Sequence, residues 1–407
     1  MSVWWKRVML GVAAATVASP LLGLAWTAQA SAQAGRGASQ ASAPTSDQVF
    51  KNVQALKGIP VDDFMGTMGI MTSALGYDCS ECHVGAGTSQ VSWETDTPRK
   101  RTARRMVEMV TTINRTNFGG RQVVTCWTCH RGRSQPLVTP TMEFVYGMPP
   151  LETDDVMTPT PGQPSPDQIL DKYVEALGGA ERLAGLTSYV GTGTAVGFGG
   201  FGRGAQVQLF AKAPDQRAMI IEFTDAPGRG DTTRSYDGRI GWLRTPLTVL
   251  GEYELTGGEL DGARLDAQLS FPGQIKQILT NVRVGPATGI SDLPAPVSQT
   301  LLQSTAMFGQ DREVHVVQGN GPRGLLVTLY FDKESGLLLR MVRHGGSPIG
   351  RVPTQIDFAD YREVNGVKLP FRMTFAWLDG RDAIQLNEVR TNVSIDPARF
   401  GRPARLK

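Results

Sequence analysis

Two copies of one short motif contain every cysteine of this 407-residue chain. The first reads Cys-Ser-Glu-Cys-His at residues 79–83, and the second reads Cys-Trp-Thr-Cys-His at residues 126–130. Two thiols at this spacing can add to the two vinyl groups on one edge of a porphyrin, and the next histidine can then bind its iron. The pattern predicts two covalently bound c-type haems. The predicted attachment residues and axial histidines are Cys79, Cys82 and His83 for one haem and Cys126, Cys129 and His130 for the other.

Three other uses of paired cysteines fit this pattern less well. The stretch between the pairs is longer than the roughly 15–20 residues that separate the pairs of a zinc ribbon. A redox-active dithiol would need only one pair, on a turn between a strand and a helix. None of these sites, nor two short disulfides, accounts for the histidine that follows each pair.

Methionine is the predicted second axial ligand of each iron. The two remaining histidines, His315 and His344, lie in the C-terminal half, and methionine commonly partners histidine in electron-transfer haems. A helix is expected after Pro60, with Asp62 as its cap and Gly76 as its end. Its apolar face is predicted to consist of Phe64, Met68, Met71 and Leu75, with Met65 at the edge.

The second motif follows a second predicted helix. Thr97 and Pro98 are expected to begin it, and Gly119-Gly120 to end it. One face carries Met106, Met109, Val110 and Ile113. Its first turns carry Arg99, Lys100, Arg101, Arg104 and Arg105. These cations are either a solvated basic face or partners for haem propionates or an acidic redox protein.

The first residues have the features of an export signal. Lys6 and Arg7 precede an apolar run, and small residues around Ala32 fit a cleavage site. Residues 1–34 are therefore predicted to be a signal peptide, and residues 35–46 a flexible spacer. The uncut run would just cross a bilayer, so retention as an anchor is the alternative. Export predicts a periplasmic location, with attachment to the periplasmic face of the inner membrane as a variant. The formal charge of +3 does not favour nucleic-acid binding.

The remaining chain divides into three predicted parts. Residues 47–133 are expected to form a mostly α dihaem domain, residues 134–166 a proline-rich linker, and residues 167–407 a β-rich domain. The β-rich part begins with a helix over 169–177. It then alternates β-branched runs with turn signals, as in a hairpin around residues 333–336. We expect an open, curved antiparallel sheet or half-barrel with a covering helix. Either residues 260–279 supply a second covering helix, or a concave apolar surface remains.

The motif region resembles the cytochrome c subunit of photosynthetic reaction centres. The sequence Arg-Arg-Met-Val-Glu-Met-Val-Thr-Thr-Ile-Asn at 104–114 matches that family's helix motif, and Val-Thr-Cys-Trp-Thr-Cys-His-Arg-Gly at 124–132 matches its haem motif. The resemblance implies that Met106 and Met68 are axial ligands, of the His130 and His83 haems respectively. Met65, Met71 and Met109 are the alternates. The full family has four haems, whereas this chain has two motifs. The chain could therefore serve a non-phototrophic respiratory pathway instead of photosynthesis.

The C-terminal half more loosely resembles outer-membrane lipoprotein carriers, through the helix over 169–177 and the hairpin over 331–338. That resemblance implies a concave face for a lipid or quinone, and a filled structural sheet is the alternative. Glycines over 197–204 are predicted to form a hairpin tip or a flap.

Together these features predict an exported dihaem electron carrier rather than an enzyme, with membrane electron-transfer complexes or soluble cytochromes as redox partners. A dihaem peroxidase and a lipid-handling β protein with an accessory cytochrome are the alternatives.

Overall fold

The computed structural model describes residues 43–88, 90–139, 157–197, 205–223, 231–245, 250–290, 312–378 and 380–404. Within it, Ala43–Lys407 form one compact unit. The predicted signal peptide, most of the spacer, residues 140–156 of the linker and most of the 197–204 glycines lie outside the described residues. The predicted domain boundaries remain a prediction. Among the described helices, none combines the length and apolar character needed to cross a membrane.

Short helices and turns form the N-terminal region, which we define as residues 43–139. They are α1 (Ser46–Val49), α2 (Val61–Leu75), the 3₁₀ turn η1 (Cys79–Glu81), α3 (Pro98–Asn117) and α4 (Cys126–His130). The two predicted methionine-bearing helices are therefore present. Gly76 ends α2 in the left-handed conformation, with φ of 65°, as expected for a residue without a Cβ. The Thr97 side chain caps α3 by accepting a hydrogen bond from the Lys100 amide.

Asp62 does not have the role predicted for it. The residue before α2 is Pro60, which makes no side-chain cap, and Asp62 is the second residue of the helix. The Asp62 carboxylate accepts a hydrogen bond from the adjacent Asp63 amide at 3.1 Å, and shorter ones from the amide and the hydroxyl of Thr256, each at 2.6 Å. Thr256 precedes α8 (Gly257–Gln268). A residue expected to act locally thus joins α2 to the start of a helix nearly two hundred positions later.

A fourteen-stranded antiparallel sheet dominates the sheet region, which we define as residues 157–404. Its order is β6-β5-β4-β3-β2-β1-β14-β13-β12-β11-β10-β9-β7, and β8 also pairs with β9. The strands are β1 (Ser188–Val196), β2 (Ala205–Lys212), β3 (Gln216–Phe223), β4 (Asp231–Tyr236), β5 (Gly241–Arg244), β6 (Glu252–Glu254), β7 (Thr280–Val284), β8 (Thr288–Ile290), β9 (Arg312–Asn320), β10 (Leu326–Asp332), β11 (Leu338–Ser347), β12 (Gly350–Val364), β13 (Val367–Ala376) and β14 (Arg381–Thr391). The predicted open antiparallel sheet is therefore confirmed.

Turn chemistry explains why successive strands pair. Between β12 and β13, Asn365 and Gly366 have φ of 51° and 80°. Two consecutive positive φ angles are what a tight two-residue hairpin turn requires, and Asn-Gly adopts them at low cost. Between β10 and β11, Asp332 accepts hydrogen bonds from the amide and the hydroxyl of Ser335. The hairpin predicted around residues 333–336 is therefore present.

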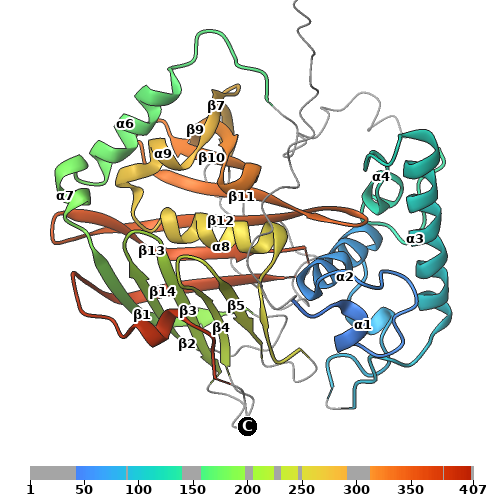
Figure 1. Cartoon of the computed structure of the whole chain (residues 1–407). Helices are drawn as coiled ribbons and strands as arrows, with labels where there is room; N and C mark the ends of the chain where they lie inside the picture. Colours follow the sequence, from blue (N-terminus) through green and yellow to red (C-terminus); the bar gives the residue numbers. More distant parts are fainter. Residues whose placement is uncertain are drawn as a thin grey trace, which may run out of the picture. The chain divides into compact units, whose positions relative to one another are not determined.

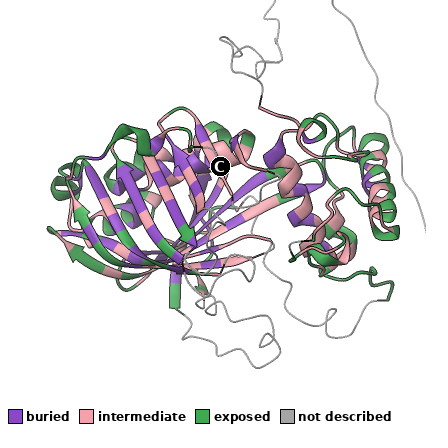
Figure 2. Cartoon of the chain, turned by 90° about the horizontal axis from the view of Figure 1, so that it is seen from below, coloured by how far each residue is buried: buried purple, intermediate pink, exposed green. Residues whose placement is uncertain are grey.

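Helices cover one face of the sheet (Figure 1). They are α6 (Pro166–Ala176), α7 (Ala180–Ala184), α8 and α9 (Ile275–Ile278). Helix α8 contacts β3, β4, β5 and β11, and Leu265, Phe271, Ile275 and Leu279 belong to the main core beside the sheet residues. The second cover expected over 260–279 therefore exists. Because α8 fills the middle of this face, the structure favours the filled sheet over an open groove. Figure 2 shows the buried residues running along the strands.

Candidate haem sites

The first motif forms a tight turn that fixes the orientation of its histidine. The Asp78 carboxylate accepts a hydrogen bond from the Ser80 amide at 2.7 Å at the start of η1. His83 Nδ1 lies 3.3 Å from the Trp93 carbonyl oxygen. A carbonyl can only accept, so Nδ1 carries the proton and Nε2 presents its lone pair. Metal-bound histidines usually show this arrangement.

The second motif repeats the arrangement with different neighbours. Thr125 and Thr128 form a reciprocal capping box at the start of α4. Arg131 then adopts the left-handed conformation, with φ of 49°, which ends the helix. His130 Nδ1 lies 2.9 Å from the Arg133 carbonyl oxygen. Both motif histidines are therefore held in the tautomer that leaves Nε2 for a metal.

The four cysteines are not joined in disulfides. In each motif one cysteine is exposed, Cys79 or Cys129, and the other is half-buried. Burial raises the pKa of Cys82 and of Cys126, which keeps these two thiols protonated. Reduced thiols that are not tied to each other fit the covalent attachment of haem c.

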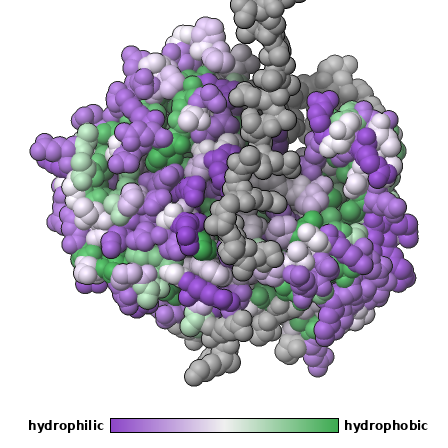
Figure 3. All heavy atoms as spheres, in the orientation of Figure 1, coloured by the Kyte–Doolittle hydropathy of each residue, from purple (hydrophilic) through white to green (hydrophobic). Residues whose placement is uncertain are grey.

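Helix α2 uses its two faces differently. Val61, Ile70 and Ala74 are fully buried, whereas Phe64, Met68, Met71 and Leu75 are half-buried. Figure 3 shows hydrophobic residues over α2, in contrast to the hydrophilic outer face of α3. A half-buried apolar row that includes thioethers fits the wall of a flat macrocycle. The predicted methionine stripe is therefore the partly accessible face of the helix.

Helix α3 buries a seam different from the predicted one. Val107, Val110 and Asn114 are its buried residues, whereas Met106 is half-buried and Met109 is 42% exposed. Met106 precedes Val107 and is only half-buried, so it lies at the edge of this buried seam. Of the two methionines, Met106 is the better shielded, and its role as an axial ligand stays a prediction.

Asn114 is a site residue that our sequence reasoning did not single out. Its side-chain amide donates to the Val124 carbonyl at 2.7 Å, and its oxygen accepts from the amides of Val123 and Val124 at 3.0 and 2.9 Å. These bonds clamp α3 to the residues just before the second motif. Its position as the last residue of the helix motif at 104–114 was the feature of the sequence that could have identified it.

The basic first turns of α3 are mostly committed to contacts within the N-terminal region. Arg99 pairs with Glu81, Arg104 pairs with Asp96 at 2.7 Å, and Lys100 Nζ donates to the Trp93 carbonyl at 2.6 Å. These contacts hold the helix against the loop that also supports His83. Burial, and then the charge of Lys100, lowers the pKa of His83 and favours its neutral form.

Helix α2 also contacts the second motif. The Gly132 amide donates to the Ala74 carbonyl at 2.9 Å. A Cβ at Gly76 would lie 2.5 Å from the Gly132 carbonyl oxygen, so glycine is required for this approach. Each methionine helix therefore lies near the second motif, and the assignment of Met68 to the His83 haem stays a prediction.

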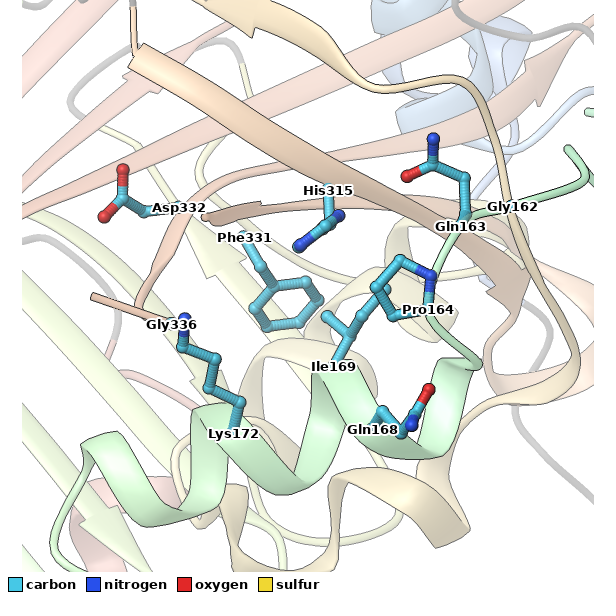
Figure 4. A pocket seen from close by; sticks show the side chains of 10 residues that line it. All are labelled: Gly162, Gln163, Pro164, Gln168, Ile169, Lys172, His315, Phe331, Asp332 and Gly336. Carbon is cyan, nitrogen blue, oxygen red and sulfur yellow. The ribbon is translucent and has the colours of Figure 1, made fainter. Parts of the chain in front are cut away.

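A cavity of about 510 Å³ lies under α6 (Figure 4). Helix α6, the preceding loop and strands β9 and β10 line it. Ile169 and Phe331 are its large apolar side chains, beside Gln163, Gln168, Lys172, His315 and Asp332. An acyl or isoprenoid chain needs a longer apolar lining. The cavity therefore gives no support to the predicted lipid or quinone.

Comparison with known proteins gives the N-terminal part a family. Residues 6–143 match the family of the photosynthetic reaction centre cytochrome c subunit. The subunit of Thermochromatium tepidum is 34% identical over 104 residues, which cover 24% of this chain and 24% of that protein. The subunit of Roseobacter denitrificans is 32% identical over 111 residues, 24% of this chain and 30% of that protein. The chain thus spans less than a third of the length of these relatives.

Solved structures similar to the sheet region are more distant. A LolA superfamily protein from Nitrosomonas europaea has a TM-score of 0.35 and 12% identity, covering 59% of this chain and 98% of that one. A DUF1329 family protein from Desulfovibrio piger has a TM-score of 0.37 and 12% identity, covering 58% and 96%. The description of the sheet rests on its own strand order. The predicted resemblance of the N-terminal part is confirmed: residues 6–143 match the photosynthetic reaction centre cytochrome c subunit family.

Proposed function

We propose that the chain is an exported c-type cytochrome that carries electrons through two covalently bound haems. The observation that carries the proposal is the shared state of the motif histidines. In both, Nδ1 is bonded to a backbone carbonyl, at 3.3 Å for His83 and 2.9 Å for His130. Two independent loops thus prepare the same nitrogen for an axial bond. The thiols of Cys79, Cys82, Cys126 and Cys129, which form no disulfides, would hold the porphyrins.

The second axial ligands in this proposal are Met68 for the His83 haem and Met106 for the His130 haem. A haem iron ligated by histidine and methionine exchanges single electrons at a raised potential. The half-buried row on α2, which includes Phe64 and Leu75, would limit water on one side. Burial of the porphyrin is one way in which a protein tunes that potential.

Replacing each ligand tests the proposal. Met106→Ala is expected to abolish one thioether-to-iron charge-transfer band and to lower one midpoint potential, because a thioether stabilises ferrous iron. Met109→Ala on the same helix is the matched control and should leave both unchanged. Unaltered spectra in both variants would refute the ligand assignment.

A dihaem peroxidase is the competing function. It would leave one iron open to peroxide, and that iron would be high-spin in the absorption spectrum. Our proposal expects two low-spin haems in the purified holoprotein. A high-spin signal with peroxide turnover would favour the enzyme.

The partner proposed for this cytochrome is a redox protein with an acidic docking surface. Residues 98–133 hold nine Lys and Arg residues and one acidic residue, Glu108. Arg115, Arg121 and Arg133 are exposed there, beside Trp127, which is 47% exposed. Opposite charges speed the encounter of two proteins and are screened by salt. The rate of electron exchange with an acidic cytochrome should therefore fall as ionic strength rises.

The location proposed is the periplasm, with attachment to the inner membrane as a variant. The proposal rests on the sequence of residues 1–34 and on the matched family. Fractionation of the native host, with the mature N-terminus read by mass spectrometry, tests it. Recovery of uncut chain in the membrane would favour the anchor.

A further inference from the structure

The tip of the β11–β12 hairpin is buried, which is unusual for a hairpin tip. Ile349 has no exposed surface, and Gly350 is also buried, although the adjacent Pro348 is exposed. Hairpin tips normally face solvent. Figure 1 shows this hairpin reaching from the sheet towards α2 and α4. Something in the N-terminal region must therefore cover the tip.

The cover consists of the helices that flank the second motif. Ile349 forms a buried cluster with Ile70 of α2 and Val107 of α3. Met71 and Cys126 pack against this cluster. Cys126 is the first cysteine of the second motif. The hairpin tip therefore reaches the side chains next to the proposed attachment point of the second haem.

Two further contacts fix the hairpin at this place. The Gln122 side-chain amide donates to the Ser347 carbonyl at 2.8 Å, which ties the hairpin to the segment leading into the second motif. A Cβ at Gly350 would lie 3.3 Å from Ile70, so the hairpin backbone and α2 are in close contact. The Ser347 hydroxyl donates to the Gly350 carbonyl at 2.8 Å and stiffens the turn. The contact is thus polar at its rim and apolar at its centre.

The first motif has different surroundings. Its described contacts come from the loop and helix start over residues 93–99. The Trp93 carbonyl oxygen lies at His83 Nδ1, and the Thr97 hydroxyl donates to the Cys82 carbonyl at 3.2 Å. Arg99 forms an ion pair with Glu81. These groups belong to the N-terminal region itself. The two motifs thus differ in whether the sheet region contributes to their walls.

We propose that the β11–β12 hairpin is a wall of the second haem site, with Ile349 as a positioning residue that keeps water from the Cys126 side of the porphyrin. The inference rests on the proposed function, in which a haem is attached at Cys126 and Cys129. Water at a haem stabilises the more highly charged ferric state, so its exclusion raises the midpoint potential. The sheet region would then act more strongly on the potential of the second haem than on that of the first, which it reaches through α2. This gives the sheet a role in the direction of electron flow between the two irons.

Redox titration of the full-length holoprotein tests the wall. Ile349→Ala should lower the midpoint potential of the second haem by more than that of the first, because Cys126 packs against the Ile349 cluster and the first motif does not. Ile349→Val, which removes one methylene and preserves the fold, should shift it in the same direction by less. The variant Cys126→Ala/Cys129→Ala identifies the second haem, because it removes that transition from the titration.

Ile356→Ala is the matched control. Ile356 lies on β12, the strand that begins just after Ile349, and is 3% exposed, but it belongs to the main core of the sheet. It should lower thermal stability without moving either potential. Unchanged potentials in folded Ile349→Ala and Ile349→Val would overturn the proposal, as would an equal shift in Ile356→Ala. A wild-type chain that carries fewer than two haems would instead refute the proposed function, which the haem count reveals before any titration.

Discussion

The N-terminal region and the sheet region are stabilised in different ways. In the described part of the N-terminal region, five apolar side chains are fully buried: Val61, Ile70, Ala74, Val107 and Val110. In the sheet region, one continuous core extends from α6 through most strands to β14. Five buried side chains are too few to offset the chain entropy of nearly a hundred residues. The N-terminal region therefore depends on its polar clamps and its contact with the sheet, and in the proposed function the two porphyrins would add further apolar burial.

This difference shows why the same chain contains both regions. In the proposed function a porphyrin would supply the apolar core that these residues lack, while specific hydrogen bonds such as those of Asn114 hold α3 in place. The sheet needs no such help, because alternating side chains on long strands bury a core by themselves. Ile70 and Ile349 lie where the two meet. A substitution in the sheet region should therefore mainly lower stability, whereas one in the N-terminal region should mainly change the properties of the haems.

The largest expected effect is in the sheet core. Phe331 has no exposed surface and packs against Tyr173, with ring centroids 5.1 Å apart. Phe331→Ala should cost about 3–5 kcal/mol of unfolding free energy, as for other buried aromatic residues cut to alanine. Chemical denaturation followed by tryptophan fluorescence measures it, while the haem spectrum of the folded variant should stay unchanged. A cost below about 1 kcal/mol would contradict the view that apolar burial stabilises this region.

A smaller effect is expected at the polar clamp of the N-terminal region. Asn114→Ala removes three hydrogen bonds and leaves the amides of Val123 and Val124 unpaired. It should cost about 1–3 kcal/mol and should perturb the spectrum of the second haem only. Asn117→Ala, at an exposed position on the same helix, is the control. If the two variants behaved alike, Asn114 would not be a clamp.

The sequence predicted features that depend on neighbouring residues, such as helix ends. It did not predict contacts between residues that are far apart in the chain. The ends of α2 and α3 follow from Gly76, Thr97 and Pro98, whose effects extend over one helical turn. The roles of Asp62 and Ile349 depend on partners far away in the chain, and periodicity within one segment holds no information about them. Asp62 was assigned to the nearest helix start because sequence patterns describe neighbours.

The smallest expected effect concerns a carboxylate where the two regions meet. Burial, and then the charges of Asp62 and Glu259, raises the pKa of Asp63 from 3.8 to about 6. The folded chain therefore binds this proton more tightly than the unfolded chain, and ionisation costs stability as the pH rises through about 4 to 6. Asp63→Asn should stabilise the protein by roughly 1–2 kcal/mol at pH 8, after allowance for partial exposure. The gain should vanish below about pH 4. A gain independent of pH would contradict the raised pKa.

The mass of the purified, intact holoprotein tests the central claim most directly. Produced in a periplasm that attaches haem, the mature chain should carry the mass of two porphyrins that survive denaturation and extraction with acidified organic solvent. The single-motif variants Cys79→Ala/Cys82→Ala and Cys126→Ala/Cys129→Ala should each carry one. A wild-type chain with one covalent haem, or with none, would contradict the account of this protein as a dihaem cytochrome.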